Sequence, residues 1–258
     1  MPSSSPSPLS SLRRRLHRAA APAAAAQGAP VDAALAAVLD RDRLDMENMR
    51  RLVAFSLAPD SRCVDVGAHH GALLQEIIRV APHGYHTAYE PLPHLAAHLR
   101  QRFPAADVRQ AALSDHAGQT TFSHVRGTAE GCSGFQVVTA PPGYADDVEQ
   151  IQVKLERLDD MLAGEDRLDL LKVDVEGAEQ QVFEGALETL RRTQPIVLFE
   201  HTFAASNAYG TEPQMIYTLL CERAGLRLFD LNGNGPFTPG EFETLSRAGD
   251  PINFVAHV

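Results

Sequence analysis

The stretch RCVDVGAHHGALLQEIIRV, residues 62–80, decides the fold class. Residues 62–66 contain a short apolar run of the length of a buried strand, and residues 71–80 carry apolar side chains at helical spacing. Gly67 and Gly71 lie between the two parts. Glycine allows a tight turn and lets a helix begin close to the end of a strand. The stretch therefore predicts a strand, a glycine turn and a helix, in that order.

The same alternation continues along the rest of the chain. Short apolar runs and amphipathic stretches follow one another, which is typical of strands that alternate with helices. The pattern predicts an α/β fold, with a doubly wound parallel sheet covered by helices on both faces. The expected strands are 85–89, one near Val108, 169–173, 196–199, 227–229 and 253–256, and the expected helices are 93–103, 177–192 and 213–224.

The middle third of the chain departs from this alternation. Residues 119–125 and 151–155 have the pattern of strands, and the Gly/Pro-rich stretch 127–144 between them has no helical period. Loops of that length in a compact domain are usually lids, binding loops or disordered segments. We therefore expect a β excursion with a long loop over one end of the sheet.

The N-terminal part divides into two segments. Residues 1–30 are Ser/Pro-rich, then basic, then rich in alanine, which predicts a disordered basic arm. A secretory signal is the alternative, but Pro22 interrupts its weakly apolar region. Residues 31–60 form an expected N-terminal helical segment, because apolar residues recur at three and four over 31–57. The remaining residues, 61–258, are expected to form the α/β domain.

Composition and charge exclude several classes of protein. The net charge of −10 disfavours binding to phosphate backbones, so we expect no nucleic-acid partner. No apolar run approaches the roughly 18 residues of a membrane helix, so we expect no membrane partner. The three cysteines are far apart and form no CxxC pair, which indicates thiols in a reducing, cytoplasmic compartment. The sequence gives no indication of oligomeric state.

Glu90 and Pro91 follow the second expected strand, 25 residues after Asp65. An acid about 20 residues beyond a glycine turn is placed to accept hydrogen bonds from both ribose hydroxyls of a nucleoside. The alternative for Glu90 is an exposed residue before a helix that begins with proline. Because a glycine turn lies upstream of Glu90, we interpret this residue as a ribose ligand.

The glycine turn does not suit a dinucleotide. A pyrophosphate site needs G-x-G-x-x-G, whereas this turn has the spacing D-x-G-x-x-x-G, opened by Asp65 and with His69 in its middle. An acid before the turn repels a phosphate and attracts an amine. The expected ligand is a nucleoside with a cationic, amino-acid-like tail, a description that fits S-adenosylmethionine.

The fourth strand ends in the most acidic motif, KVDVEGAE at 172–179. Asp174 lies at the expected strand tip, and Glu176 and Glu179 fall in the turn and the first turn of a helix. Three carboxylates near one sheet edge can hold an amine, a metal or a proton. For the two glutamates, a favourable interaction with the helix N-terminus is an equally good interpretation. For Asp174 we favour a function, because folding alone poorly explains an acid there.

Histidines supply the remaining candidates. His201 follows the fifth strand and is a candidate base, since imidazole can exchange protons near neutral pH. His94 and His98 lie four apart on an expected helix, but no HExxH glutamate lies between them. A solvated helix face explains this pair, and we expect no required metal.

Several ordered motifs resemble the FkbM family of S-adenosylmethionine-dependent methyltransferases over about residues 63–201. The motifs are DVGAHHG, YEP, AALSDHAG, LDDML, KVDVEGAE, the Glu-Gly-Ala at 184–186, and PIVLFE. The resemblance implies a class I, Rossmann-like sheet of seven strands with an antiparallel last strand, and makes 61–258 the methyltransferase domain. The family often has Asn at the position of His69. The resemblance also implies a short strand pair around residues 112–125.

The resemblance and the residues together imply a site and a reaction. We expect O-methylation of a hydroxyl on a small-molecule or sugar-containing acceptor, with S-adenosylmethionine as cofactor. The alternatives are a non-catalytic S-adenosylmethionine-binding scaffold and a nicotinamide-dependent oxidoreductase. The expected cofactor-binding residues are Asp65, Gly67, Ala68, His69, Gly71, Glu90, Pro91, Gln110, Ala111 and Asp174, and the expected catalytic residues are His201, Glu176 and Glu179.

Overall fold

The computed structural model describes residues 33–125, 133–135 and 148–258. The expected arm 1–30 and most of the expected loop 127–144 lie outside the described residues. The helix expected over 31–57 is confirmed as α2 (Ala33–Ser56). No helix in the described ranges has the length and apolar content needed to cross a membrane.

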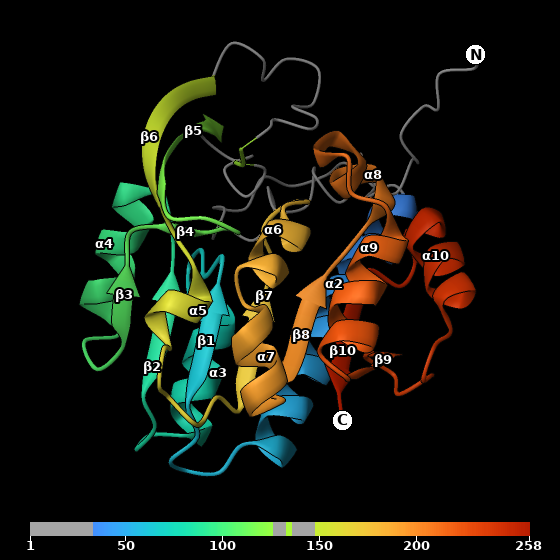
Figure 1. The fold of residues 1–258 in the computed structure, drawn as a ribbon, viewed down its shortest axis with the longest axis horizontal. Helices are drawn as coiled ribbons and strands as arrows, with labels where there is room; N and C mark the ends of the chain where they lie inside the picture. Colours follow the sequence, from blue (N-terminus) through green and yellow to red (C-terminus); the bar gives the residue numbers. More distant parts are fainter. Residues whose placement is uncertain (1–32, 126–132, 136–147) are drawn as a thin grey trace.

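The main sheet has seven strands in the order β3-β2-β1-β7-β8-β10-β9 (Figure 1). The first five of these strands are parallel to one another. β10 is antiparallel to both β8 and β9, as expected for the last strand. The strands are β1 (Cys63–Val66), β2 (His86–Tyr89), β3 (Asp107–Arg109), β7 (Leu170–Val173), β8 (Ile196–Glu200), β9 (Arg227–Asp230) and β10 (Asn253–His257).

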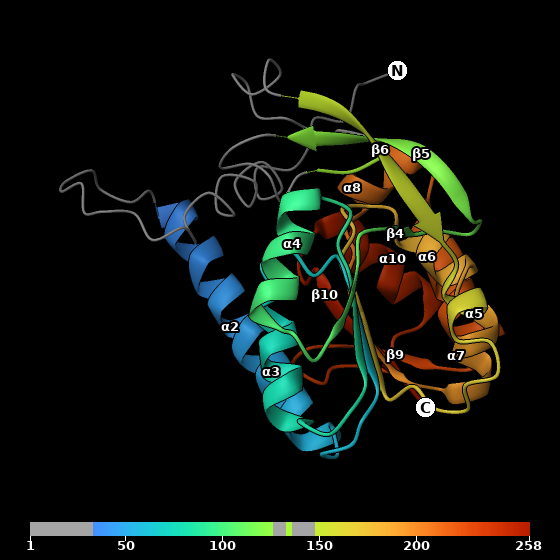
Figure 2. The same cartoon turned by 90° about the vertical axis from the view of Figure 1, so that its left-hand side faces the viewer.

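Helices cover both faces of this sheet (Figure 2). One face carries α2, α3 (Ala72–Val80) and α4 (Pro93–Arg102), and the other carries α5 (Leu158–Met161), α6 (Glu179–Glu184) and α7 (Leu187–Thr193). The chain also forms α8 (Phe203–Ser206), η3 (Asn207–Tyr209), α9 (Pro213–Tyr217), the π-helix η4 (Thr218–Arg223) and α10 (Pro239–Ala248).

The side chains of β1 show why the sheet must be covered twice. Val64 and Val66 belong to a core cluster with Phe183 of α6, whereas Cys63 belongs to a second cluster with Val53 of α2. Successive side chains of a strand point to opposite faces, so β1 is buried on both faces, one carrying Val64 and Val66 and the other Cys63 and Asp65. A strand of this kind is expected inside a parallel sheet.

A second sheet of three strands lies beyond the ends of the main sheet, above α4 (Figure 1). It consists of β4 (Ala112–Leu113), β5 (Gly118–Val125) and β6 (Val148–Glu156), in the order β4-β6-β5. It confirms the strands expected at 119–125 and 151–155. Leu92 and Leu95 at the start of α4 pack against Phe122 and Val153 of this sheet. Glu156 accepts a hydrogen bond from Arg109 at 2.9 Å and so joins β6 to β3.

Two expected helices are interrupted in the structure. The prediction of one helix over 177–192 was wrong, because α6 ends at Glu184 and α7 begins at Leu187. A Cβ atom at Gly185 would lie 2.0 Å from the backbone oxygen of Ser114, so the chain passes too close to β4 for a side chain there. The helix expected over 213–224 consists of α9 and the π-helix that follows it.

Gly185→Ala should lower the free energy of unfolding by about 1–3 kcal/mol, because the new methyl group must displace backbone at Ser114. Gly240→Ala in α10 is the control, since a Cβ there meets no atom within 4 Å. At such an open site alanine should be neutral or stabilise by about 0.4–1 kcal/mol. Urea unfolding of both variants measures the difference. Equal stabilities would show that contact with Ser114 does not cause the helix break.

Candidate active site

The glycine turn after β1 is held in an unusual backbone conformation. Gly67, His69 and Gly71 have φ values of 72°, 48° and 76°. A Cβ atom at Gly67 would lie 1.9 Å from the backbone oxygen of Asp174, which follows β7. Glycine is therefore required at position 67 because two strand-end turns cross there. Ala68, which lies between Gly67 and His69, is buried in the core.

Gly71 has a different role in the same turn. It is the N-cap of α3, and a Cβ atom there would lie 2.4 Å from the Phe103 ring at the end of α4. Its missing side chain lets α3 begin directly beside α4.

Glu90 joins the end of β2 to the glycine turn. Its Oε2 accepts the backbone N–H of His69 and its Oε1 accepts the backbone N–H of Leu92, both at 2.9 Å. The residue is buried, and Pro91 follows it directly. Two amide donors fix the orientation of this carboxylate, so it is preorganised at the strand end.

The two residues after β3 differ in exposure. The side chain of Gln110 is exposed, whereas Ala111 is buried in the main core. Of these two expected cofactor-binding residues, only Gln110 presents its side chain at the surface of the described structure.

Lys172 lies at the centre of the site, although the sequence analysis assigned it no role. Its Nζ donates to the backbone oxygens of Val66 at 3.2 Å and Gly67 at 2.6 Å. The same atom lies 3.2 Å from Asp65 Oδ1 and 3.7 Å from Asp174 Oδ2. Burial lowers the pKa of this lysine, but the charges of Asp65 and Asp174 outweigh burial and hold its pKa above the ordinary value.

A signal for Lys172 was present in the composition. The chain contains only two lysines, Lys154 and Lys172, against 21 arginines. Where a chain uses arginine for nearly every cation, a lysine within a motif indicates a position that a guanidinium cannot fill.

The turn after β7 is strained and packs against α8. Glu176 has a φ of 54°, which is rare for a residue with a side chain, and such residues cluster at functional sites. A Cβ atom at Gly177 would lie 2.6 Å from the backbone oxygen of Ala205. Glu179 is buried, and its Oε1 accepts the backbone N–H of Gly177 at 2.9 Å.

His201 and Glu179 come together behind this turn. The Nδ1 atom of His201 lies 3.5 Å from Glu179 Oε2, and both side chains are almost fully buried. The imidazole stacks on the Phe242 ring with centroids 5.5 Å apart. Neither ring nitrogen has a hydrogen-bond partner within the described part of the chain. Buried polar atoms are rarely left unpaired, so this arrangement calls for an explanation.

The structure offers no metal-binding cluster among its described residues: no three His, Cys, Asp or Glu side chains are arranged to hold an ion. The His94 ring approaches His124, with centroids 5.5 Å apart, and the His98 ring approaches His70 at 5.9 Å. These two helix histidines therefore face different neighbours.

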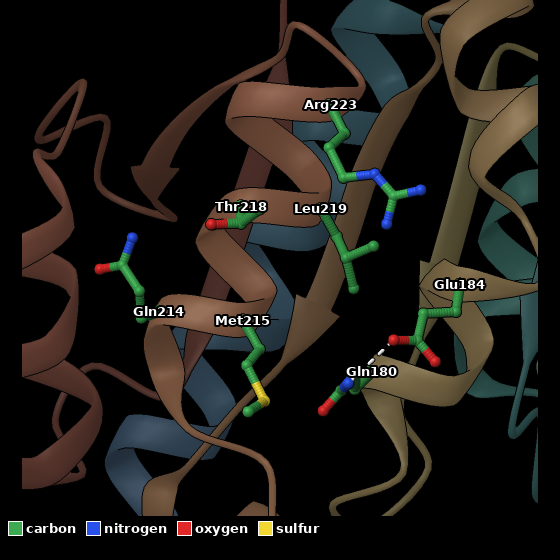
Figure 3. A pocket seen from close by; sticks show the side chains of 7 residues that line it. All are labelled: Gln180, Glu184, Gln214, Met215, Thr218, Leu219 and Arg223. Atoms are coloured by element: carbon green, nitrogen blue, oxygen red, sulfur yellow. Dashed lines mark hydrogen bonds between the residues drawn. The ribbon is translucent and has the colours of Figure 1, made fainter.

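A groove of about 290 Å³ lies between α6 and the α9–η4 helix (Figure 3). Met215 and Leu219 supply its apolar part, and Gln180 and Glu184 hydrogen-bond to each other on one wall. It contains none of the residues expected to bind cofactor.

The sequence also matches a model of a protein family. The model described as the methyltransferase FkbM domain matches residues 65–228. The chain belongs to the FkbM methyltransferase family.

Curated relatives of this FkbM-family chain include two bacterial proteins. The 2-O-methyltransferase NoeI of Sinorhizobium fredii is 28% identical over 158 residues, which cover 56% of this chain and 65% of NoeI. The AMB antimetabolite synthetase AmbE of Pseudomonas aeruginosa is 30% identical over 181 residues, which cover 56% of this chain and 8% of AmbE. The chain thus spans less than two thirds of each relative.

Solved structures similar to this FkbM-family chain include two methyltransferases. The methyltransferase FkbM from Methylobacillus flagellatus has a TM-score of 0.48 and 14% identity, covering 78% of this chain and 44% of that one. A TehB-like S-adenosylmethionine-dependent methyltransferase from Corynebacterium glutamicum has a TM-score of 0.43 and 13% identity, covering 86% of this chain and 95% of that one.

Gly67→Ala should destabilise the FkbM-family domain more than Gly164→Ala. Both glycines have a positive φ, so both variants bear the left-handed backbone cost of about 1–2 kcal/mol. Only at Gly67 does the new Cβ collide with another segment, since nothing lies within 4 Å at Gly164. The collision should add about 1–3 kcal/mol, measured by urea unfolding. Equal losses would mean that the crossing with Asp174 is not rigid.

Proposed function

We propose that this chain is an S-adenosylmethionine-dependent methyltransferase that acts on a hydroxyl of a small-molecule or sugar-containing acceptor. The charge of the site carries the proposal. Asp65, Glu90 and Asp174 converge with the single ammonium of Lys172 at the carboxyl ends of β1, β2 and β7. Three formal negative charges against one positive charge suit a cationic ligand and disfavour a pyrophosphate.

The residues present fit this donor. The carboxylate of Glu90, held by two backbone amides, would accept hydrogen bonds from the ribose hydroxyls. The partly exposed Asp174 would attract the positive end of the methionine part, and Gln110 would border the adenine. Gly67, His69 and Gly71, whose positive φ angles shape the turn, would surround the methionine part.

The donor would supply a methyl group already activated by a positively charged sulfur. The chain then has three tasks: to align the acceptor hydroxyl, to exclude water and to remove a proton. Alignment and exclusion of water should provide most of the rate, because the methyl group needs no further activation.

We propose His201 as the group that removes the proton, with Glu179 beside it. Among the described residues neither ring nitrogen has a hydrogen-bond partner, and Glu179 approaches to 3.5 Å. Both facts support this role, because a purely structural imidazole would normally be hydrogen-bonded. The imidazole is buried in the described structure. For this role, a path from the acceptor hydroxyl to the ring must therefore open when the complex forms. Glu176 is the alternative base, since it is partly exposed in the strained turn.

The relatives support the choice of acceptor class. NoeI is by its name a 2-O-methyltransferase, and this chain aligns with 65% of it. A non-catalytic scaffold remains the competing hypothesis, and the retained carboxylates Asp174, Glu176 and Glu179 speak against it. Incubation with labelled S-adenosylmethionine and a panel of sugars and hydroxylated metabolites separates the two hypotheses.

Glu90→Ala should weaken binding of S-adenosylmethionine by about 1.5–3 kcal/mol, the usual cost of losing hydrogen bonds to a charged group. Calorimetry measures this, with Glu188→Ala on the exposed surface of α7 as control. A titration with NAD in parallel tests the oxidoreductase alternative. An unchanged dissociation constant in Glu90→Ala, or tighter binding of NAD by the wild type, would contradict the assignment.

His201→Ala should lower kcat by about 100-fold or more while leaving the affinity for S-adenosylmethionine unchanged, as expected for loss of a general base. Phe242→Leu is the control, because it disturbs the ring stack and keeps the imidazole. Near-normal turnover in His201→Ala, with loss of turnover in Glu176→Gln, would transfer the role to Glu176.

A further inference from the structure

Lys172 is one of two lysines in a chain with 21 arginines, and it lies where the carboxylates of the proposed donor site meet. Its side chain is 12% exposed, whereas that of Lys154 is 62% exposed. The other lysine pairs with Glu156 on the rim of the second sheet. The two lysines therefore differ in environment: Lys154 is exposed on a rim, and Lys172 is buried among carboxylates.

The register of the sheet places Lys172 beside Asp65. The two residues are direct partners on β7 and β1, so their side chains lie on the same face of the sheet. The ammonium lies near four oxygen atoms. Two belong to the carboxylates of Asp65 and Asp174, and two to the backbone of Val66 and Gly67. A compact ammonium with three rotatable donors suits oxygens in several directions, whereas a planar guanidinium does not.

The two carboxylates bound to Lys172 differ in exposure. The side chain of Asp65 is 2% exposed and that of Asp174 is 36% exposed. Lys172 therefore compensates a charge that faces inward, and its weaker contact at 3.7 Å leaves Asp174 open to the site.

We propose that Lys172 is the positioning residue of the donor site, holding the glycine turn and Asp174 in the arrangement that receives the cationic part of S-adenosylmethionine. The inference rests on the proposed function. It also assigns Asp65 a supporting role, in which this acid holds Lys172 and does not itself contact the donor.

Lys172 does not act as a base in this arrangement. Its Nζ hydrogen-bonds to the backbone oxygens of Val66 and Gly67, and the neighbouring carboxylates hold its pKa above the ordinary value. A purely stabilising role also explains the arrangement poorly, because buried ion pairs can often be replaced by apolar residues with no loss of stability.

The test uses three variants of the full chain. Lys172→Met removes the ammonium and should destabilise the fold, because it leaves Asp65 buried without its partner. Asp65→Asn is the second single variant. The double variant Asp65→Asn/Lys172→Met removes both charges and should recover most of the melting temperature that Lys172→Met loses.

Calorimetry with S-adenosylmethionine and S-adenosylhomocysteine then separates positioning from stability. The double variant should bind S-adenosylmethionine about tenfold or more weakly than wild type, as for lost charge-assisted hydrogen bonds. Asp65→Asn alone, which keeps the ammonium on Gly67 and Asp174, should bind more tightly than the double variant. Lys154→Met is the lysine control and should bind like wild type.

A spectroscopic readout is available because the chain has only two lysines. Selective ¹⁵N labelling of lysine gives two side-chain signals, and the buried ammonium should be protected from exchange with water. The signal missing from Lys172→Met belongs to Lys172, and it should shift when S-adenosylhomocysteine is added to wild type.

The outcomes are distinct. If wild type binds neither ligand, the proposed function is wrong and this inference is wrong with it. If wild type binds but the double variant binds within about twofold of it, the positioning role of Lys172 alone is overturned. An unshifted Lys172 signal at saturating S-adenosylhomocysteine also overturns the positioning role.

Discussion

The contact between the backbones of Gly67 and Asp174 fixes the geometry on which the rest of the site depends. There is no room for even one carbon atom between the turn after β1 and the turn after β7, since a Cβ would lie 1.9 Å from the Asp174 oxygen. The ammonium of Lys172 bonds to the same turn from inside the sheet. The ends of neighbouring strands are thereby locked together, and carboxylates carried by different elements converge with little freedom of their own.

Much of the fold could be predicted from local pattern because the sheet is parallel and doubly covered. Strands such as β1 are buried on both faces and mostly apolar, and the helix period between them is clear. The break at Gly185 could not be predicted, because it depends on a close approach of Ser114 from another part of the chain. The helix α10 was missed although Thr238 and Glu241 form a capping box at its start. The start of α10 is therefore predictable from local sequence alone.

The candidate site was predicted in part, for a physical reason. The carboxyl ends of parallel strands share one edge, so acids that follow successive strands must lie near each other. Partners across strands depend on register, which the sequence pattern does not contain. The pairing of Lys172 with Asp65 and the approach of His201 to Glu179 are of this kind. The pattern could place residues at the edge, but it could not tell a carboxylate that faces a ligand from one that faces a lysine.

The scarcity of lysine has a consequence for covalent modification of this protein. Acylation of amines is a common way to remove positive charge from a side chain, and it acts on lysine. Only Lys154 and Lys172 carry such amines here, and Lys172 is buried. The other cationic side chains, apart from histidines, are guanidinium groups that stay charged at any physiological pH and keep their charge when methylated. The positive charges that balance the acidic surface are therefore almost entirely beyond the reach of acylating enzymes and metabolites.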